Sequence, residues 1–142
     1  MAPKKIIIKG NPVRGEDTAN AGITPGHIIE LISTGKVQKQ ATASLNSPKM
    51  VAIENWVKGD EIGTAYAANE QVQWAICGSG DEAYCFLSDG ENVSIGDELE
   101  FGTTDGEFVA RSSGISVATA LEAVDLSASS NSAAGRIKLR FH

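Results

Sequence analysis

Residues capable of acid–base or nucleophilic chemistry are sparse in this 142-residue sequence. Its two histidines are His27, which follows a Pro-Gly corner, and His142, so only one imidazole is internal. No serine or cysteine lies in the Gly-x-Ser-x-Gly pattern of a hydrolase elbow, and a hydroxyl or thiol without a partnered base is a weak nucleophile. We therefore interpret His27 as a surface histidine and expect no catalytic residue and no enzymatic activity.

Acidic side chains are plentiful, but their spacing matches no metal motif. The groups at 89–92 and 97–98 lack the register of Asp, Asn and Gly that surrounds calcium with oxygen ligands. Most charged side chains in a small domain are simply solvated. The sequence predicts no metal site and no cofactor.

Cys77 and Cys85 belong to the clearest pair of predicted strands. The runs Val72–Cys77 and Glu82–Leu87 are rich in apolar and aromatic residues and are separated by Gly-Ser-Gly-Asp, which predicts a hairpin with a four-residue loop. In that register the two cysteines are not opposite each other. We expect two free thiols that pack as small hydrophobic side chains.

Turn signals dominate the rest of the chain. Fifteen glycines are spread along it, and Thr-Gly, Asp-Gly and Ser-Gly pairs alternate with short β-branched or aromatic runs. With 42% hydrophobic residues, the chain is long enough to bury one core without a metal or a disulfide. The sequence predicts a mainly β fold, a small β-barrel with at most one or two short helices.

A faint internal repeat supports this prediction. The segment 23–31, a Thr-Gly turn and the segment 36–39 parallel the segment 93–101, an Asp-Gly turn and the segment 107–111. Both copies place glycine at the same offset, where the backbone is expected to turn a corner that a side chain would obstruct. We interpret the copies as two hairpins at similar corners of one barrel.

Two segments fit more than one structure. Residues 47–56 fit a short helix capped by Ser47 or a strand over Met50–Ile53. Residues 115–124 combine helix-favouring alanines with the alternation of a strand. We favour the strand there, because the strictly alternating segment Arg136–Phe141 needs a partner.

The first 22 residues are polar and rich in Gly and Asn, apart from the triplet Ile6-Ile7-Ile8. Such a segment buries too little apolar surface to offset its ordering entropy. It is either a frayed terminus with a short edge strand or an arm that becomes ordered against a partner. We divide the chain into an N-terminal arm, 1–22, and one β-rich domain, 23–142.

The formal net charge of -6 is unevenly distributed. Residues 1–58 carry +4, residues 59–110 carry twelve acids and no lysine or arginine, and residues 111–142 carry +2. Nucleic-acid binding needs a basic body, so nucleic acid is not an expected partner. No apolar run approaches the roughly 18 residues of a membrane span, so a membrane is not expected either. We expect synthesis in the cytoplasm.

Several short motifs follow one another in a distinctive order. They are Asn11-Pro12-Val13, Gly22 to Leu31, Ala65 to Ala68 with Gln71-Val72, Gly80 to Tyr84, Asp89 to Val93 with Ile95 to Asp97, and Val117 to Val124. Their order and spacing, from about Ile6 to Phe141, resemble those of head decoration, or capsid cement, proteins of tailed bacteriophages. The sequence departs from the family pattern at Asn55–Gly59.

The resemblance implies a β-tulip-like decoration fold with an extended N-terminal arm. It implies a homotrimer at local threefold axes on the outer surface of the virion, bound to the major capsid protein and made in the host bacterial cytoplasm. The expected capsid-binding arm comprises Lys4, Lys5, Ile6, Ile7, Ile8, Lys9, Val13 and Arg14. Its aliphatic triplet would add a strand to a capsid sheet edge while the lysines steer it.

A subunit or capsid interface is expected at Trp56, Arg136, Lys138 and Arg140. Trp56 is included because exposed aromatic side chains in loops often anchor contacts. The alternative is a surface-displayed module that binds a carbohydrate or a host-surface ligand through a concave aromatic patch, with Trp56, Tyr66 and Tyr84 as candidates. A small hydrolase that uses the acidic cluster ranks last.

The two thiols give a first prediction. Intact mass measurement of the purified, air-oxidised protein should show both cysteines reduced, because the expected register keeps them apart. A mass lower by two protons, with a bond between Cys77 and Cys85, would contradict that register.

Overall fold

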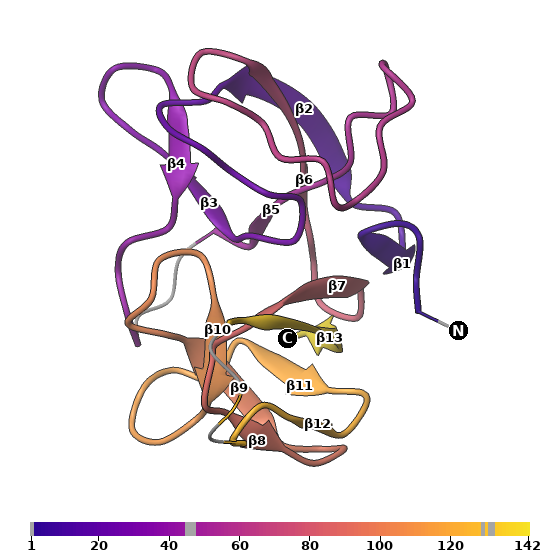
Figure 1. Cartoon of the computed structure of the whole chain (residues 1–142), viewed down its shortest axis with the longest axis vertical. Helices are drawn as coiled ribbons and strands as arrows, with labels where there is room; N and C mark the ends of the chain where they lie inside the picture. The colour runs from indigo at the N-terminus through magenta and orange to yellow at the C-terminus, as the bar shows by residue number, and fades with distance from the viewer. Residues whose placement is uncertain (1, 45–47, 129, 131–132) are drawn as a thin grey trace.

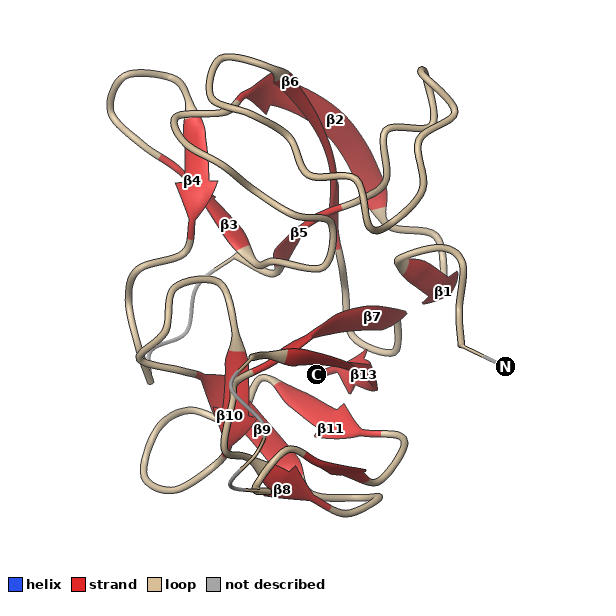
Figure 2. Cartoon of the chain, viewed as in Figure 1, coloured by secondary structure: helices blue, strands red, loops and turns tan. Residues whose placement is uncertain are grey.

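The computed structural model describes residues 2–44, 48–128, 130 and 133–142 as strands and loops, with no helix among them (Figures 1 and 2). The strands are β1 (Ile7–Lys9), β2 (Val13–Thr18), β3 (Ile29–Leu31), β4 (Val37–Lys39), β5 (Met50–Ala52), β6 (Gln71–Ile76), β7 (Glu82–Leu87), β8 (Asn92–Val93), β9 (Glu98–Phe101), β10 (Phe108–Ala110), β11 (Ala118–Ala120), β12 (Val124–Asp125) and β13 (Gly135–Phe141). Within these residues, nothing forms a helix suited to crossing a bilayer. The predicted mainly β fold is confirmed.

Five strands close into a barrel in the lower half of Figure 1. Their order is β7, β10, β9, β11 and β13, and β13 pairs in turn with β7. The β7–β13 ladder runs from Gly135 opposite Leu87 to Arg140 opposite Glu82. Closure removes the unpaired edges that an open sheet would expose, and the predicted small barrel is therefore present.

Alternation along β13 fills the barrel. Ile137, Leu139 and Phe141 are buried, whereas the residues between them point away from the core. The Phe141 ring lies 6.1 Å from that of Phe108, which in turn lies 5.5 Å from that of Phe101. Tilted aromatic pairs at these distances add packing energy beyond the area they bury.

A second layer lies above the barrel in Figure 1. It consists of the three-stranded sheet β2-β6-β5 and the hairpin β3-β4. Its own apolar cluster includes Ile23, Ile29, Val37, Tyr66 and Val72. Strands β5 and β6 join this layer to the barrel core, because Val51 and Ala75 pack into the barrel cluster.

The predicted hairpin between the two cysteine-containing runs is wrong. Both strands form, but β6 pairs with β2 and β5, whereas β7 pairs with β1, β10 and β13. The linker between β6 and β7, residues 77–81, contacts the end of β13 instead, since the Gly80 amide donates to the Phe141 carbonyl at 2.9 Å. Alternation of apolar and polar residues identifies a strand but not its partner. Here β13 pairs with β7 along the whole of β7, and this takes the place of the expected pairing with β6.

The repeat does encode two antiparallel hairpins, β3–β4 and β9–β10. Gly26 and Gly96 have φ of 103° and 93°, a region that residues with a side chain rarely adopt. Only the second hairpin lies in the barrel, so the expected pair of corners in one barrel is not formed. Instead the Gly106 turn contacts the first copy, accepting from the Ile28 amide at 3.0 Å.

The two segments that fit more than one structure are strands. Met50–Ala52 forms β5, which pairs with β6, while the expected cap Ser47 lies outside the described residues. Ala118–Ala120 forms β11 and pairs with β13, as the alternation of the last segment predicted. In both places a neighbouring strand overrides local helix propensity.

The N-terminal segment differs from an arm that awaits a partner. Ile6 is fully buried in the barrel core, and β1 pairs with β7. β2 pairs with β6 over its whole length, from Val13 opposite Ile76 to Thr18 opposite Gln71. These contacts bury apolar surface and so offset the entropy lost when residues 1–22 become ordered. The composition of residues 1–22 does not indicate them, because the partner strands lie more than fifty residues away in the sequence.

Replacing Ile6 by alanine should lower the free energy of unfolding by about 2–5 kcal/mol, because the change leaves a cavity in the barrel core. Ile95, which is 71% exposed, is the matched control, and Ile95→Ala should change stability by less than about 0.5 kcal/mol. Denaturant unfolding measures both. Equal effects would show that the N-terminal segment does not belong to the core.

Candidate functional site

Two adjoining hollows border β2 and share Arg14 and Trp56 as lining residues. The larger, of about 410 Å³, is lined by Arg14, Gly15, Glu16, Ile53, Trp56, Val57, Gln73 and Trp74. The smaller, of about 340 Å³, is lined by Lys5, Ile7, Arg14, Glu54 and Trp56. We call the larger the Trp56 groove and the smaller the Lys5 hollow.

The strand pairing positions the polar side of the Trp56 groove. In the β2–β6 register Glu16 lies opposite Gln73, and the Gln73 Nε2 amide donates to Glu16 Oε2 at 2.8 Å. Arg14 lies two residues from Glu16, so the two side chains project from the same face of β2. Because Gln73 is only 8% exposed, packing restricts its side chain. Its hydrogen bond therefore holds the Glu16 carboxylate at the edge of the groove.

A tight loop after Ile53 presents the apolar side of the groove. The Lys58 amide donates to the Asn55 carbonyl, the Gly59 amide donates to the Trp56 carbonyl, and Gly59 has φ of 75°. These bonds turn the chain so that Trp56 and Val57 stay 63% and 64% exposed. Large apolar side chains exposed together mark surfaces that contact another molecule.

The two cations that line the hollows are not held in ion pairs by any described residue. Among the described residues, Arg14 and Lys5 make no ion pair, whereas Lys58 pairs with Glu70 at 3.4 Å. Glu54, the acid of the Lys5 hollow, accepts from the Ile6 amide at 3.1 Å. The site therefore combines an exposed tryptophan, an unpaired guanidinium and two carboxylates that backbone or side-chain amides hold in place.

The structure brings together four of the residues expected in the arm and interface, namely Lys5, Ile7, Arg14 and Trp56. Val13 is close in sequence and 67% exposed. Ile8 is half-buried, Lys9 is exposed, and Lys4 lines a separate hollow with Glu61 and Ile62. The buried Ile6 is not available to a partner, so the isoleucine triplet cannot dock as a unit.

The cations of β13 lie apart from this site, and two of them have internal partners. Arg136 donates from Nη2 to the carbonyls of Pro25 and Ile62 at 3.0 and 2.7 Å, and its guanidinium lies 4.6 Å from the centre of the Phe86 ring. Arg140 pairs with Glu82 at 3.1 Å. Arg136 therefore joins loops to the barrel, and burial lowers its pKa. Lys138 is half-buried.

His27 and Tyr66 also differ from the sequence interpretation. His27 is buried, its ring lies 4.5 Å from that of Phe86, and its Nδ1 accepts from the Thr24 amide at 3.1 Å. Burial, followed by the positive charges of Lys39 and Arg136, lowers its pKa to about 4. The Tyr66 hydroxyl donates to the Ile53 carbonyl at 2.7 Å, so this ring supports the Trp56 loop from inside.

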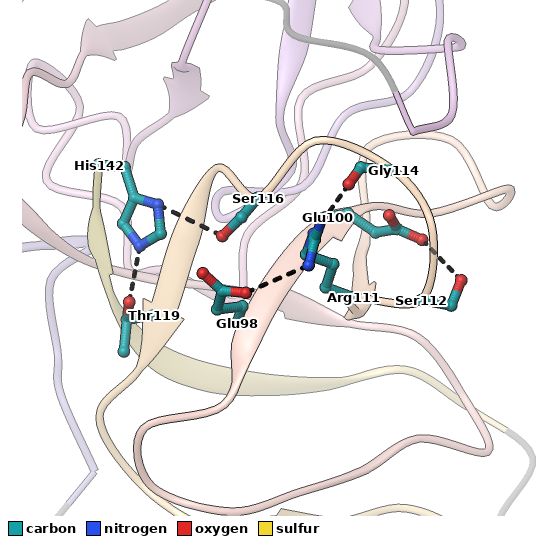
Figure 3. A network of polar contacts seen from close by, with 8 residues as sticks. All are labelled: Glu98, Glu100, Arg111, Ser112, Gly114, Ser116, Thr119 and His142. Atoms are coloured by element: carbon teal, nitrogen blue, oxygen red, sulfur yellow. Dashed lines mark hydrogen bonds and ion pairs between the residues drawn. The ribbon is translucent and has the colours of Figure 1, made fainter.

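A polar network at one end of the barrel was missed by the sequence analysis (Figure 3). Thr119 Oγ1 and Ser116 Oγ lie 2.7 and 3.3 Å from the two ring nitrogens of His142. Arg111 reaches the Gly114 carbonyl at 2.9 Å and Glu98 at 3.5 Å. These contacts tie the end of β13 to β11 and to the loop after β10. No sequence motif indicates these contacts, because they join residues up to 26 positions apart.

Cys77 and Cys85 are free and buried, as predicted. Burial raises the pKa of Cys77 to about 12 and that of Cys85 well above its ordinary value. Thiols that stay protonated are poor nucleophiles and poor metal ligands. Across the described part of the chain, no three His, Cys, Asp or Glu side chains are grouped so as to hold a metal ion.

Comparison of the sequence with protein-family models and with curated proteins finds no match.

The His27 environment predicts a pH effect on stability. The pKa of His27 is 6.5 in the unfolded chain and about 4 in the folded chain. Between these two pH values, His27 binds a proton in the unfolded chain but not in the folded chain. The stabilisation present above pH 6.5 is therefore lost as pH falls towards 4. Chemical unfolding at about pH 7 and about pH 5 should show a larger loss for the natural chain than for His27→Gln. Equal losses would contradict the assignment.

Proposed function

We propose that the chain is a capsid decoration protein that binds the outer surface of an expanded phage shell. In this proposal it binds the major capsid protein as a homotrimer at local threefold axes, and it stabilises the virion against internal DNA pressure without catalysing a reaction. The observation that carries the proposal is an exposed apolar surface that lies beside cations. Val13, Trp56 and Val57 are exposed near Arg14 and Lys5, which form no ion pair with any described residue, and twelve acids occur in residues 59–110 of the sequence.

The lysine-bearing side of β1 is the proposed shell contact. Lys4, Lys5 and Lys9 are exposed around a strand that is already folded onto the barrel. A prefolded face loses less conformational entropy on binding than an arm that must become ordered. Many identical subunits on one lattice can then stabilise a shell even if each contact is modest, because the contacts act together.

Charge also gives this face a direction. An acidic shell surface would attract the lysines around β1 and repel the acids of residues 59–110. The two effects together would orient each subunit as it approaches the shell. Such steering acts over about 8 Å at physiological salt and shortens as salt rises. A purely apolar contact would not show this dependence.

Co-sedimentation tests the proposal. Purified protein should pellet at fixed stoichiometry with expanded empty capsids of the phage that encodes it, and binding should weaken as salt rises above about 0.15 M. The triple variant Lys4→Glu, Lys5→Glu, Lys9→Glu should bind at least about tenfold more weakly, because it reverses three charges on the contact.

Lys36→Glu is the control, since Lys36 belongs to the β3–β4 turn and hydrogen-bonds to Asn69 at 2.9 Å. It should bind the shell as the natural chain does. Failure of the natural chain to pellet under any salt condition would overturn the proposed function. Equal loss in the triple variant and the control would overturn only the choice of face.

A further inference from the structure

The Trp56 groove has the composition of a small-ligand site. Its volume of about 410 Å³ lies within the range of pockets that hold small molecules. An apolar wall formed by Trp56, Val57 and Ile53 faces polar side chains from β2 and β6. Small-ligand sites are typically concave, with a mostly apolar lining and a few polar groups that fix the orientation of the ligand, and this groove has both features.

We propose that the Trp56 groove binds an acidic saccharide, a sugar ring that carries a carboxylate. The proposal goes beyond the proposed function and does not depend on it. A pyranose has an apolar face of C–H groups and a rim of hydroxyls, so it needs an aromatic surface on one side and hydrogen-bonding groups on the other. The groove supplies both within one hollow.

Trp56 supplies the aromatic surface. Its side chain is 63% exposed at the wall of the groove. An aromatic ring stacked on an apolar ligand face contributes binding energy without requiring a hydrogen-bond partner for every ligand atom. Nothing in the described fold occupies the space beside it, and the turn at Gly59 holds the loop in position before a ligand arrives.

Glu16 supplies an acceptor for ligand hydroxyls. One carboxylate oxygen accepts from Gln73 Nε2, which leaves the other oxygen available. Gln73 is a positioning residue, because it is 8% exposed and fixes the Glu16 carboxylate before binding. An acceptor held in place loses less entropy when it binds than a free surface carboxylate does.

Arg14 selects for an acid. It lines both hollows and, in the described residues, forms no ion pair, so its planar guanidinium can bind a carboxylate in bidentate fashion. Lys5 adds a second positive charge in the adjoining hollow. The two carboxylates of the hollows, Glu16 and Glu54, already accept from amides and form no ion pair with these cations, so a ligand carboxylate would supply the missing anion, which predicts a preference for uronic acids.

Nuclear magnetic resonance of the ¹⁵N-labelled full chain tests the proposal. Tetragalacturonate and a hyaluronan tetrasaccharide are the acidic probes, and maltotetraose is the neutral probe. The acidic probes should shift the Trp56 indole resonance in a saturable way and bind at least about tenfold more tightly than maltotetraose. The backbone amide of Phe141 is the internal reference, since Phe141 is buried in the barrel core and does not line the groove.

Three variants separate the roles. Arg14→Gln should reduce the preference for acidic over neutral probes to less than about twofold, because it removes only the charge. Trp56→Ala lacks the indole resonance, so its binding is followed through the backbone amides of Val57 and Gly15, which also line the groove, and the substitution should weaken binding of all probes by at least about tenfold. Ile95→Ala, which removes an exposed apolar side chain elsewhere, should leave binding unchanged.

Three outcomes would overturn the proposal. The first is the absence of a saturable shift with any probe up to about 20 mM, which corresponds to a free energy of binding too small for a specific site. The second is equal binding of acidic probes by the natural chain and Trp56→Ala. The third is a Trp56 resonance that responds to empty capsids but to no saccharide, which would make the groove a protein contact. Thermal unfolding of each variant confirms that it is folded.

Discussion

The pairing of β13 with β7 is the interaction on which the rest of the structure depends. It closes the barrel, places Ile137 and Leu139 in its core, and leaves the opposite edge of β7 to β1 and β10. Without this ladder the barrel would become an open sheet with two unpaired edges. The position of β1, and with it the Lys5 hollow, follows from the closure.

The groove results from a meeting of segments distant in sequence. β2 can lie on β6 because Gly15 has no side chain, and a Cβ there would come within 2.5 Å of the Trp74 ring. β5 holds the other side of β6, and the chain that leaves it turns at once into the Trp56 loop. Backbone pairing therefore carries a tryptophan and an arginine to one hollow, although neither residue belongs to a recognisable motif.

Sequence reasoning located elements better than partners. Local alternation was enough for β13, β11 and the two repeated hairpins, because each depends on residues that are close in the chain. The N-terminal pairing and the separation of β6 from β7 depend on long-range packing, which composition does not report. The same holds for the site: Trp56 was identified as exposed, but Glu16 and Gln73 were missed because only the β2–β6 register brings them together.

The sharing of β7 has a mechanical consequence. β1 and β13 are both antiparallel to β7 and meet it at the same residue, with Ile7 and Leu139 each paired to Ala83. The two outer strands are therefore parallel to each other. A force that pulls the chain at the start of β1 and at the end of β13 would be transmitted through both ladders, and the β1–β7 ladder, with two registered pairs against six in β13–β7, would bear it with fewer contacts. The strands nearest the two ends of the chain are thus joined mechanically through β7.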